Sequence, residues 1–277
     1  DHSIGEVIAT LKKENIYDNT FIIVMADNGR PFPHSKTRLN DQGVKTPFIL
    51  SFKNGNITGK TSSLVSSIDI APTILDFAGI KVNQSFQGNS FKNLLEKPDK
   101  PFRNYVFAEH NWHDFESHGR MVRNKNFMLI ENNRTQFAHL GPLDALNSES
   151  YFSLLEKKES GEISEIQSEI FISPRPKEEF YNMQNDFFQR KNLINNKETQ
   201  IEINNLRNIL SEWKSETGDS NPDQITKHWY KRTPGPLKAR NNLDSSIELL
   251  KTPFHGIRGE FPGVSNNATQ INNKGPF

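Results

Sequence analysis

TFIIVMADNGRPFPHSKTRLNDQGVKTP, residues 20–47, contains the features from which we predict the architecture. It opens with six apolar residues, 21–26, which predict a strand buried on both faces, as found inside a parallel sheet. Asp27, Asn28 and a glycine follow, so two hard oxygen donors lie past the carboxyl end of a strand, where open α/β sheets bind ligands. Oxygen donors suit Ca²⁺ or Mg²⁺ rather than zinc. The alternative is a plain strand-ending turn, because these are ordinary turn residues.

Composition excludes several classes of protein. The 277 residues allow one large domain or two modest ones, and 34% apolar residues with a mean hydropathy of −0.70 predict an exposed connection or tail. The net charge of 34 − 33 = +1 gives no sign of nucleic acid or a membrane surface as a partner. No apolar stretch approaches the roughly 20 residues that span a bilayer. The absence of cysteine excludes disulfides and thiolate metal sites.

The rest of the segment carries a family resemblance. PFPHSK at 31–36 is followed by GVKTP at 43–47 and a second apolar run at 48–50. In this order the motifs resemble those of the type I sulfatases of the alkaline-phosphatase-like superfamily, and look most like the N-sulfoglucosamine sulfohydrolase-like branch. The resemblance implies that Asp27 and Asn28 bind Ca²⁺, that Lys36 is a catalytic residue contacting the sulfate, and that the substrate is a sulfated carbohydrate.

The predicted fold class is α/β. Residues 1–97 are expected to form the C-terminal part of an alkaline-phosphatase-like domain with a mixed or parallel sheet. Residues 98–217 are expected to form a small α+β subdomain, an antiparallel sheet with one long helix, carrying an insertion at about 133–172. Residues 218–277 are a wrapping or disordered tail.

Pattern and motif predict the individual elements. Apolar residues at helical spacing predict helices at residues 4–11 and 201–213, and the apolar segment 64–79 contains a third helix with Pro72 in its first turn and Gly79 as its C-terminal cap. Apolar runs predict strands at 48–52, 105–109 and 179–183, and a hairpin of residues 120–123 and 127–131. We interpret Asp69 as a helix-start residue rather than a ligand. Arg120 and Arg123 are expected to share a strand face and to pair with Glu178 or Glu179.

Four further residues are candidates for substrate binding. His110 and His113 follow the first strand of the small subdomain, where the resemblance implies a loop that faces the active site and contacts the sugar. His34 lies two residues before Lys36, and Arg30 follows the glycine of the metal motif. Arg30 would meet a substrate carboxylate or only solvent. The alternative for each is a polar surface residue.

The family's nucleophile is missing from the sequence. Type I sulfatases use a formylglycine made from Cys/Ser-x-Pro-Ser-Arg, whereas this chain has no Cys and no Ser-x-Pro-x-Arg. The resemblance places residue 1 past the middle of the family's catalytic domain, so the expected partner is the missing N-terminal half of that domain. We therefore expect the chain alone neither to hydrolyse sulfate esters nor to bind Ca²⁺ tightly, because calcium needs about six or more oxygens. The full-length protein is expected to be periplasmic or secreted.

Two other functions remain open. One is a different reaction of the same superfamily, by a phosphatase, phosphodiesterase or phosphonate hydrolase. The other is a non-catalytic module that binds glycan. The identity of the nucleophile would separate the first from a sulfatase, and glycan binding without activity would favour the second.

Overall fold

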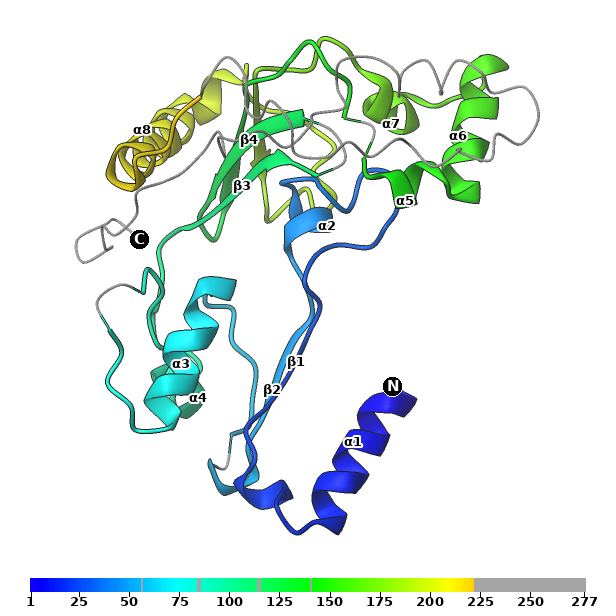
Figure 1. Ribbon diagram of the computed structural model, residues 1–277. Coiled ribbons are helices and arrows are strands. Elements are labelled where there is room, and N and C mark those ends of the chain that lie inside the picture. The colour runs from blue at the N-terminus through cyan, green and yellow to red at the C-terminus, as the bar shows by residue number, and fades with distance from the viewer. Residues whose placement is uncertain (56, 84–85, 114–115, 140, 222–277) are drawn as a thin grey trace, which may run out of the picture. The chain divides into compact units, whose positions relative to one another are not determined.

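The computed structural model describes residues 1–55, 57–83, 86–113, 116–139 and 141–221 (Figure 1). The chain forms two compact units. The first contains Asp1–Asp27 and Thr46–Arg103, and the second contains Asn28–Lys45 and the chain from Asn104 onward. The predicted domains were continuous in sequence, whereas residues 28–45 group with the second unit. Most of the predicted tail, from residue 222, lies outside the described residues.

The first unit opens with α1 (His2–Lys13), η1 (Tyr17–Asn19) and a two-stranded sheet of β1 (Ile22–Met25) and β2 (Phe48–Ser51), followed by η2 (Lys53–Gly55). The two strands run antiparallel. The predicted burial of the first strand on both faces is wrong in this structure, because Met25 is 40% exposed and the other β1 residues are only half-buried. In the described part of the chain β2 is the one strand paired with β1, so no continuous sheet encloses it.

The remainder of the first unit contains η3 (Ser67–Asp69), α3 (Ile70–Phe77) and α4 (Lys92–Glu96). Asp69 is a helix-start residue, as predicted, because its carboxylate accepts the backbone N–H of Ser66 at 2.8 Å in a capping box. The same fully buried carboxylate accepts from Arg103 Nε at 2.8 Å. Gly79 follows α3 with a φ of +69°, the left-handed conformation expected after a helix end.

The second unit contains a four-stranded antiparallel sheet in the order β3-β4-β5-β6 (Figure 1). The strands are β3 (Val106–Trp112), β4 (Glu116–Arg123), β5 (Phe127–Asn132) and β6 (Glu178–Asn182), and one long helix, α8 (Gln200–Thr217), follows η5 (Lys197–Thr199). The predicted hairpin is confirmed, and the side chain of Asn124 closes its turn by accepting from the backbone N–H of Phe127 at 2.7 Å. No helix among the described residues is long and apolar enough to cross a membrane.

Alternation along the strands gives this sheet two different faces. Val122, Leu129 and Phe180 point to one face, where α8 packs against them. Met121 and Met128 point to the other face, where Leu39 of residues 28–45 packs. The segment that carries Lys36 is therefore held by the face of the sheet opposite to α8.

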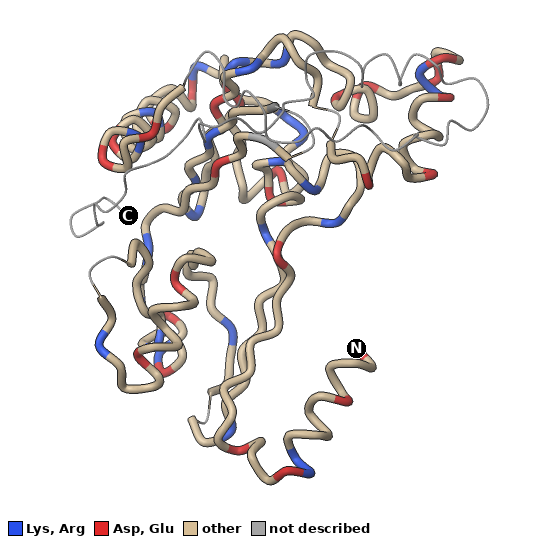
Figure 2. Tube along the Cα trace, viewed as in Figure 1, with Lys and Arg blue, Asp and Glu red and all other residues tan. Residues whose placement is uncertain are grey.

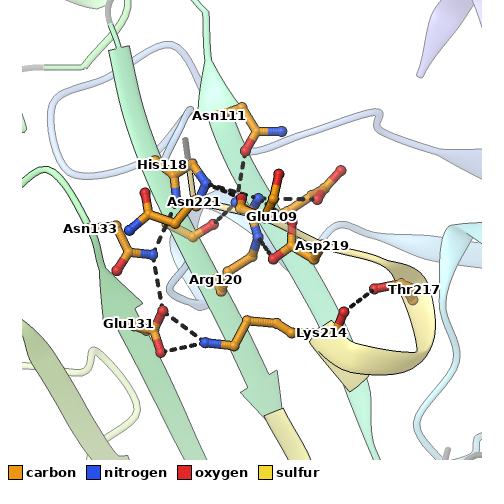
Figure 3. Close-up of polar contacts among 12 residues, drawn as sticks. Glu109, Asn111, His118, Arg120, Glu131, Asn133, Lys214, Thr217, Asp219 and Asn221 are labelled. Atoms are coloured by element: carbon orange, nitrogen blue, oxygen red, sulfur yellow. Dashed lines mark hydrogen bonds and ion pairs between the residues drawn. The ribbon is translucent and has the colours of Figure 1, made fainter. Parts of the chain in front are cut away.

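A polar network links β3, β4 and β5 to the end of α8 (Figure 3). Arg120 is fully buried and donates to Asp219 at 2.7 Å and to Asn111 at 2.7 Å. Lys214 of α8 donates to Glu131 of β5 at 2.8 Å. These contacts fasten the C-terminal end of the helix to the sheet.

The predicted partners of the two arginines are wrong. Arg120 pairs with Asp219, and Arg123 pairs with Asp41, whereas Glu178 pairs with Arg207. The two arginines are three residues apart on β4, so they point to opposite faces and cannot share one set of partners.

Candidate functional site

Two glycines close the base of the segment Asn28–Lys45, which we term the site loop. The N–H of Gly29 donates to the carbonyl of Gly43 at 2.8 Å. A Cβ at Gly29 would lie 2.0 Å from the carbonyl oxygen of Gln42, and one at Gly43 would lie 2.1 Å from that of Arg38. The glycine of the Asp-Asn-Gly motif therefore allows two backbone segments to approach closely, which an ordinary turn does not require.

The site loop is strained on both sides of Lys36. His34 has a φ of 63° and Thr37 a φ of 71°, and left-handed residues other than glycine cost on the order of 1–3 kcal/mol each. Such strain persists only where the surroundings determine the backbone. Lys36 therefore lies in a segment of defined conformation, and its side chain is 21% exposed.

Contacts with the sheet hold part of the site loop in its strained conformation. Leu39 packs over Gly119 of β4, where a Cβ would lie 2.8 Å from Leu39 Cδ1. Arg123 of β4 forms an ion pair with Asp41, which begins α2 (Asp41–Val44). The N–H of Asp41 also donates to Gln189 Oε1 at 3.0 Å. Together these contacts hold the C-terminal half of the site loop.

The predicted insertion supplies the remaining contacts. Residues 143–171, which we term the strap, contain α5 (Leu143–Leu146), α6 (Glu149–Glu159), α7 (Glu165–Ser168) and η4 (Glu169–Phe171). Its acidic residues and the basic residues of the site loop can be followed in Figure 2. Arg38 donates two hydrogen bonds to Glu169, at 3.0 and 2.9 Å. Lys36 Nζ donates to Asp144 Oδ2 at 2.8 Å.

Glu169 also fixes the ring of His34. Asn40 Nδ2 lies 2.9 Å from His34 Nε2, and His34 Nδ1 lies 2.8 Å from Glu169 Oε2. With a proton on Nδ1, the ring donates to Glu169, and Nε2 can accept from Asn40. Burial tends to raise the pKa of Glu169, but Arg38 and His34 outweigh it and lower this pKa to about 2. In this conformation neither ring nitrogen of His34 is open to a substrate.

A pair of stacked histidines lies in the same unit. The rings of His110 and His139 stack with their centroids 5.6 Å apart, and Arg175 lies 2.8 Å from His139 Nδ1. Both nitrogens of His110 are inaccessible to solvent and have no hydrogen-bond partner among the residues that the structure describes. Burial, followed by the charges of His113, Arg175 and Arg38, lowers the pKa of His110 to about 3. His110 is therefore neutral at physiological pH.

A small cavity lies between the site loop, the strap and the sheet. Its volume is about 20 Å³, room for about one water molecule and too little for a sugar. Arg38 Nε and Asn40 Oδ1 belong to residues that line it, and neither atom has a partner among the described residues. The cavity is therefore suited to one bridging water and not to a substrate.

The structure brings some of the predicted site residues together. Lys36 and His34 share the site loop and its contacts with the strap. Asp27 is exposed and Asn28 is half-buried just beyond the end of β1, while Arg30 and His113 are exposed. The metal and substrate roles of these residues stay predictions.

Several residues that contact the site loop were not predicted. Asp144, Glu169 and His139 come from the strap and the segment before it, more than 100 residues after the site loop in sequence for each contact. The polar composition of the insertion was a visible signal, but local spacing does not reveal which distant lysine or arginine an acid will meet.

The donor chemistry at Asp27 and Asn28 fits a calcium ion only in part. A carboxylate and an amide are hard oxygen ligands, but they supply two of the about six or more that calcium takes. Within the described ranges there is no group of three or more His, Asp or Glu side chains that could hold a metal ion. Further ligands would have to come from outside this set.

Comparison with known proteins identifies the family. The family model "Sulfatase" matches residues 1–80. An ulvan-active sulfatase of Formosa agariphila is 32% identical over 237 residues, 83% of this chain and 39% of that protein. The N-sulphoglucosamine sulphohydrolase of Homo sapiens is 25% identical over 233 residues, 79% of this chain and 46% of that protein. The chain thus spans less than half the length of either relative.

A solved structure extends the similarity to the fold. A protein determined in complex with its substrate D-glucosamine-2-N,6-O-disulfate superposes with a TM-score of 0.55 at 22% identity, over 77% of this chain and 38% of that one. This likeness includes the second unit, because it extends well beyond residue 80. The alkaline-phosphatase-like fold predicted from the motifs is therefore confirmed, and the chain is a member of the sulfatase family.

Proposed function

We propose that this chain forms part of the active site of a sulfatase that hydrolyses sulfate esters of a carbohydrate. In this proposal Lys36 binds an oxygen of the sulfate group, and Asp27 and Asn28 give two oxygen ligands to a divalent cation. The family match and the named relatives support the reaction class. The relatives act on ulvan and sulphoglucosamine by their names, which supports a sulfated glycan as the substrate class.

The observation that carries the proposal is the construction of the site loop. Gly29 and Gly43 close its base, and strained residues flank Lys36 in a segment that packs on the sheet. A strained backbone that its surroundings hold in place is typical of a functional segment. A compact ammonium with three donors suits an oxygen of a sulfate group.

The cation and the nucleophile have different roles in this proposal. A bound divalent cation would supply Lewis-acid polarisation of the sulfate. Asp27 and Asn28 would orient part of its ligand shell, and Lys36 would offset the negative charge of the substrate. The sequence holds neither a Cys nor a Ser-x-Pro-x-Arg motif for a formylglycine, so we assign only binding and orientation to the residues named here.

Substrate contacts are assigned by accessibility. His113 and Arg30 are exposed and are the candidates for contact with the sugar. The nitrogens of His110 are inaccessible, and those of His34 are committed to Asn40 and Glu169. His110 and His34 would therefore reach a substrate only after the strap or its neighbours rearrange.

Binding of a sulfated sugar by the purified chain tests the proposal. We expect N-acetyl-D-glucosamine 6-sulfate to shift the NMR signals of the site loop in a titration at constant ionic strength. Lys36→Met should remove this binding, whereas Lys53→Met should retain it. Lys53 is a matched control because it too is a lysine paired with an aspartate, Asp18, at 2.7 Å. Equal binding by the chain and by Lys36→Met would refute the role of Lys36.

A further inference from the structure

This inference rests on the proposed function and concerns what controls access to Lys36. The three basic side chains at positions 34, 36 and 38 of the site loop all contact carboxylates of the strap. Glu169 takes two of them, and Asp144 takes Lys36 alone. The strap therefore meets the anion-binding segment with negative charges at every basic position from 34 to 38.

We propose that Asp144 is a specificity-determining residue that competes with the substrate's anionic group for Lys36. Asp144 Oδ2 accepts from Lys36 Nζ at 2.8 Å, the distance at which a sulfate oxygen would bind the same ammonium. The carboxylate thus occupies one of the directions in which Lys36 can donate. A ligand must displace it or bind beside it against its charge.

The position of the competing carboxylate is fixed by the fold of the strap. Asp144 Oδ1 accepts the backbone N–H of Ala145 at 3.0 Å, so one oxygen is held within α5 while the other meets Lys36. Ala145 and Leu146 are buried, and Leu146 packs with Tyr151 and Ile170 in the core of the strap. Asp144 is therefore presented to Lys36 by a packed element and not by a freely moving loop.

The two acidic contacts of the strap differ in how readily a ligand can displace them. Arg38 is 8% exposed and binds Glu169 through two parallel hydrogen bonds, a geometry that favours a lasting structural pair. Asp144 is 48% exposed and Lys36 is 21% exposed, so water and solute reach this pair and its attraction is weak. A ligand can replace Asp144 at Lys36 while Glu169 keeps the strap attached.

The consequence is a threshold for binding. A small anion would gain little free energy of binding at Lys36, because its contact with the ammonium only replaces the contact that Asp144 already makes. A sulfated sugar adds hydroxyl and ring contacts, so it has the additional binding energy needed to displace Asp144. The device therefore favours sulfated carbohydrate over small anions.

Replacing the charge of Asp144 while keeping its shape tests this inference. Asp144→Asn retains an acceptor oxygen for Lys36 but removes the negative charge. We expect it to bind N-acetyl-D-glucosamine 6-sulfate about fivefold more tightly than the unmodified chain, and inorganic sulfate by at least the same factor, because like-charge repulsion is removed. Asp18→Asn, which neutralises the exposed partner of Lys53, is the matched control and should leave both affinities unchanged.

The outcomes separate the two proposals. Equal or weaker binding by Asp144→Asn, with binding still lost in Lys36→Met, would overturn the competition and leave the function of Lys36 intact. Binding that survives in Lys36→Met, or that is absent from every variant, would overturn both. Unsulfated N-acetyl-D-glucosamine should show no gain from Asp144→Asn, and an equal gain would show that the effect is not electrostatic. Unchanged circular dichroism would establish that the variant folds.

Discussion

His110 shows how one residue can depart from what its motif suggests. The family resemblance implied a loop position that faces the sugar, whereas His110 lies within β3, both of its nitrogens are inaccessible and its ring stacks on His139. Burial disfavours the protonated ring in the folded chain, so this residue lowers stability once the pH is low enough for the unfolded chain to take up a proton. Its effect on stability is therefore a function of pH.

The sign of this effect follows from the direction of the shift. The pKa of His110 is about 3 in the folded state, below the ordinary value of 6.5. Between these values only the unfolded chain is protonated at this residue, so the free energy of unfolding decreases as the pH falls. From pH 8 to pH 5 this loss amounts to about 2 kcal/mol for one histidine.

We expect His110→Phe to remove that part of the pH dependence. Phenylalanine retains a ring for stacking on His139 and cannot take up a proton. Urea unfolding at pH 8 and pH 5 should show a loss of stability smaller by about 2 kcal/mol than in the unmodified chain. His2→Phe is the matched control, because His2 is 89% exposed and should leave the pH dependence unchanged. An identical loss in His110→Phe and the unmodified chain would contradict the account.

At the scale of elements, the site loop and the strap depend on each other. The strap has its own small core, but its polar links to the site loop run through Glu169 and Asp144, and Arg38 and His34 share the first of these. The pKa of Glu169 is lowered to about 2, below the ordinary value of 4.5, mainly by the charge of Arg38. A depressed carboxyl pKa contributes stability that is complete above the unfolded value and is lost as the pH falls toward the folded one.

Glu169→Gln should therefore act in one window of pH. At pH 7 we expect the variant to unfold at a lower urea concentration than the unmodified chain. The difference should shrink between about pH 4.5 and pH 2, because the unmodified Glu169 is itself protonated there. Glu165→Gln, an exposed acid on the same strap, should show no such convergence. A difference that stays constant over this window would mean that the charge of Glu169 is not the cause.

The elements also show what could be predicted from sequence. The hairpin of β4 and β5, the helix α8 and the capping role of Asp69 were predictable, because periodicity and capping motifs are local. The antiparallel pairing of β1 was missed, since an apolar run predicts a strand but not its neighbour. The partners of Arg120 and Arg123 were missed for a similar reason, because they lie 99 and 82 residues away.

The roles of the candidate site residues stay predictions, and their contacts could not be predicted from the sequence. The motif gave Lys36, and the resemblance gave it a sulfate as its ligand. Nothing in the sequence around position 36 indicated that Asp144 would meet it from 108 residues away. Ion pairs between residues far apart in sequence depend on how the elements pack, and the local spacing of residues does not reveal that packing.

At the scale of the whole molecule, the two units differ in how their apolar residues are used. In the second unit both faces of the sheet are covered, by α8 on one side and Leu39 on the other. In the first unit α1 has no buried residue, and Val7 and Ile49 are each about 60% exposed. Stability should therefore be concentrated in the second unit.

Hydrogen exchange can test this division through one core residue. Leu206 of α8 is fully buried against the sheet, and Leu206→Ala should destabilise its surroundings by about 2–5 kcal/mol. Amides of α8, β4 and β5 should lose protection together, because they share this core, whereas those of β1 and β2 should keep their own rates. Ile201→Ala, at an 82% exposed position of the same helix, should change neither group. If β1 and β2 lost protection in step with β4, the two units would unfold as one cooperative body, and the proposed division of stability would be wrong.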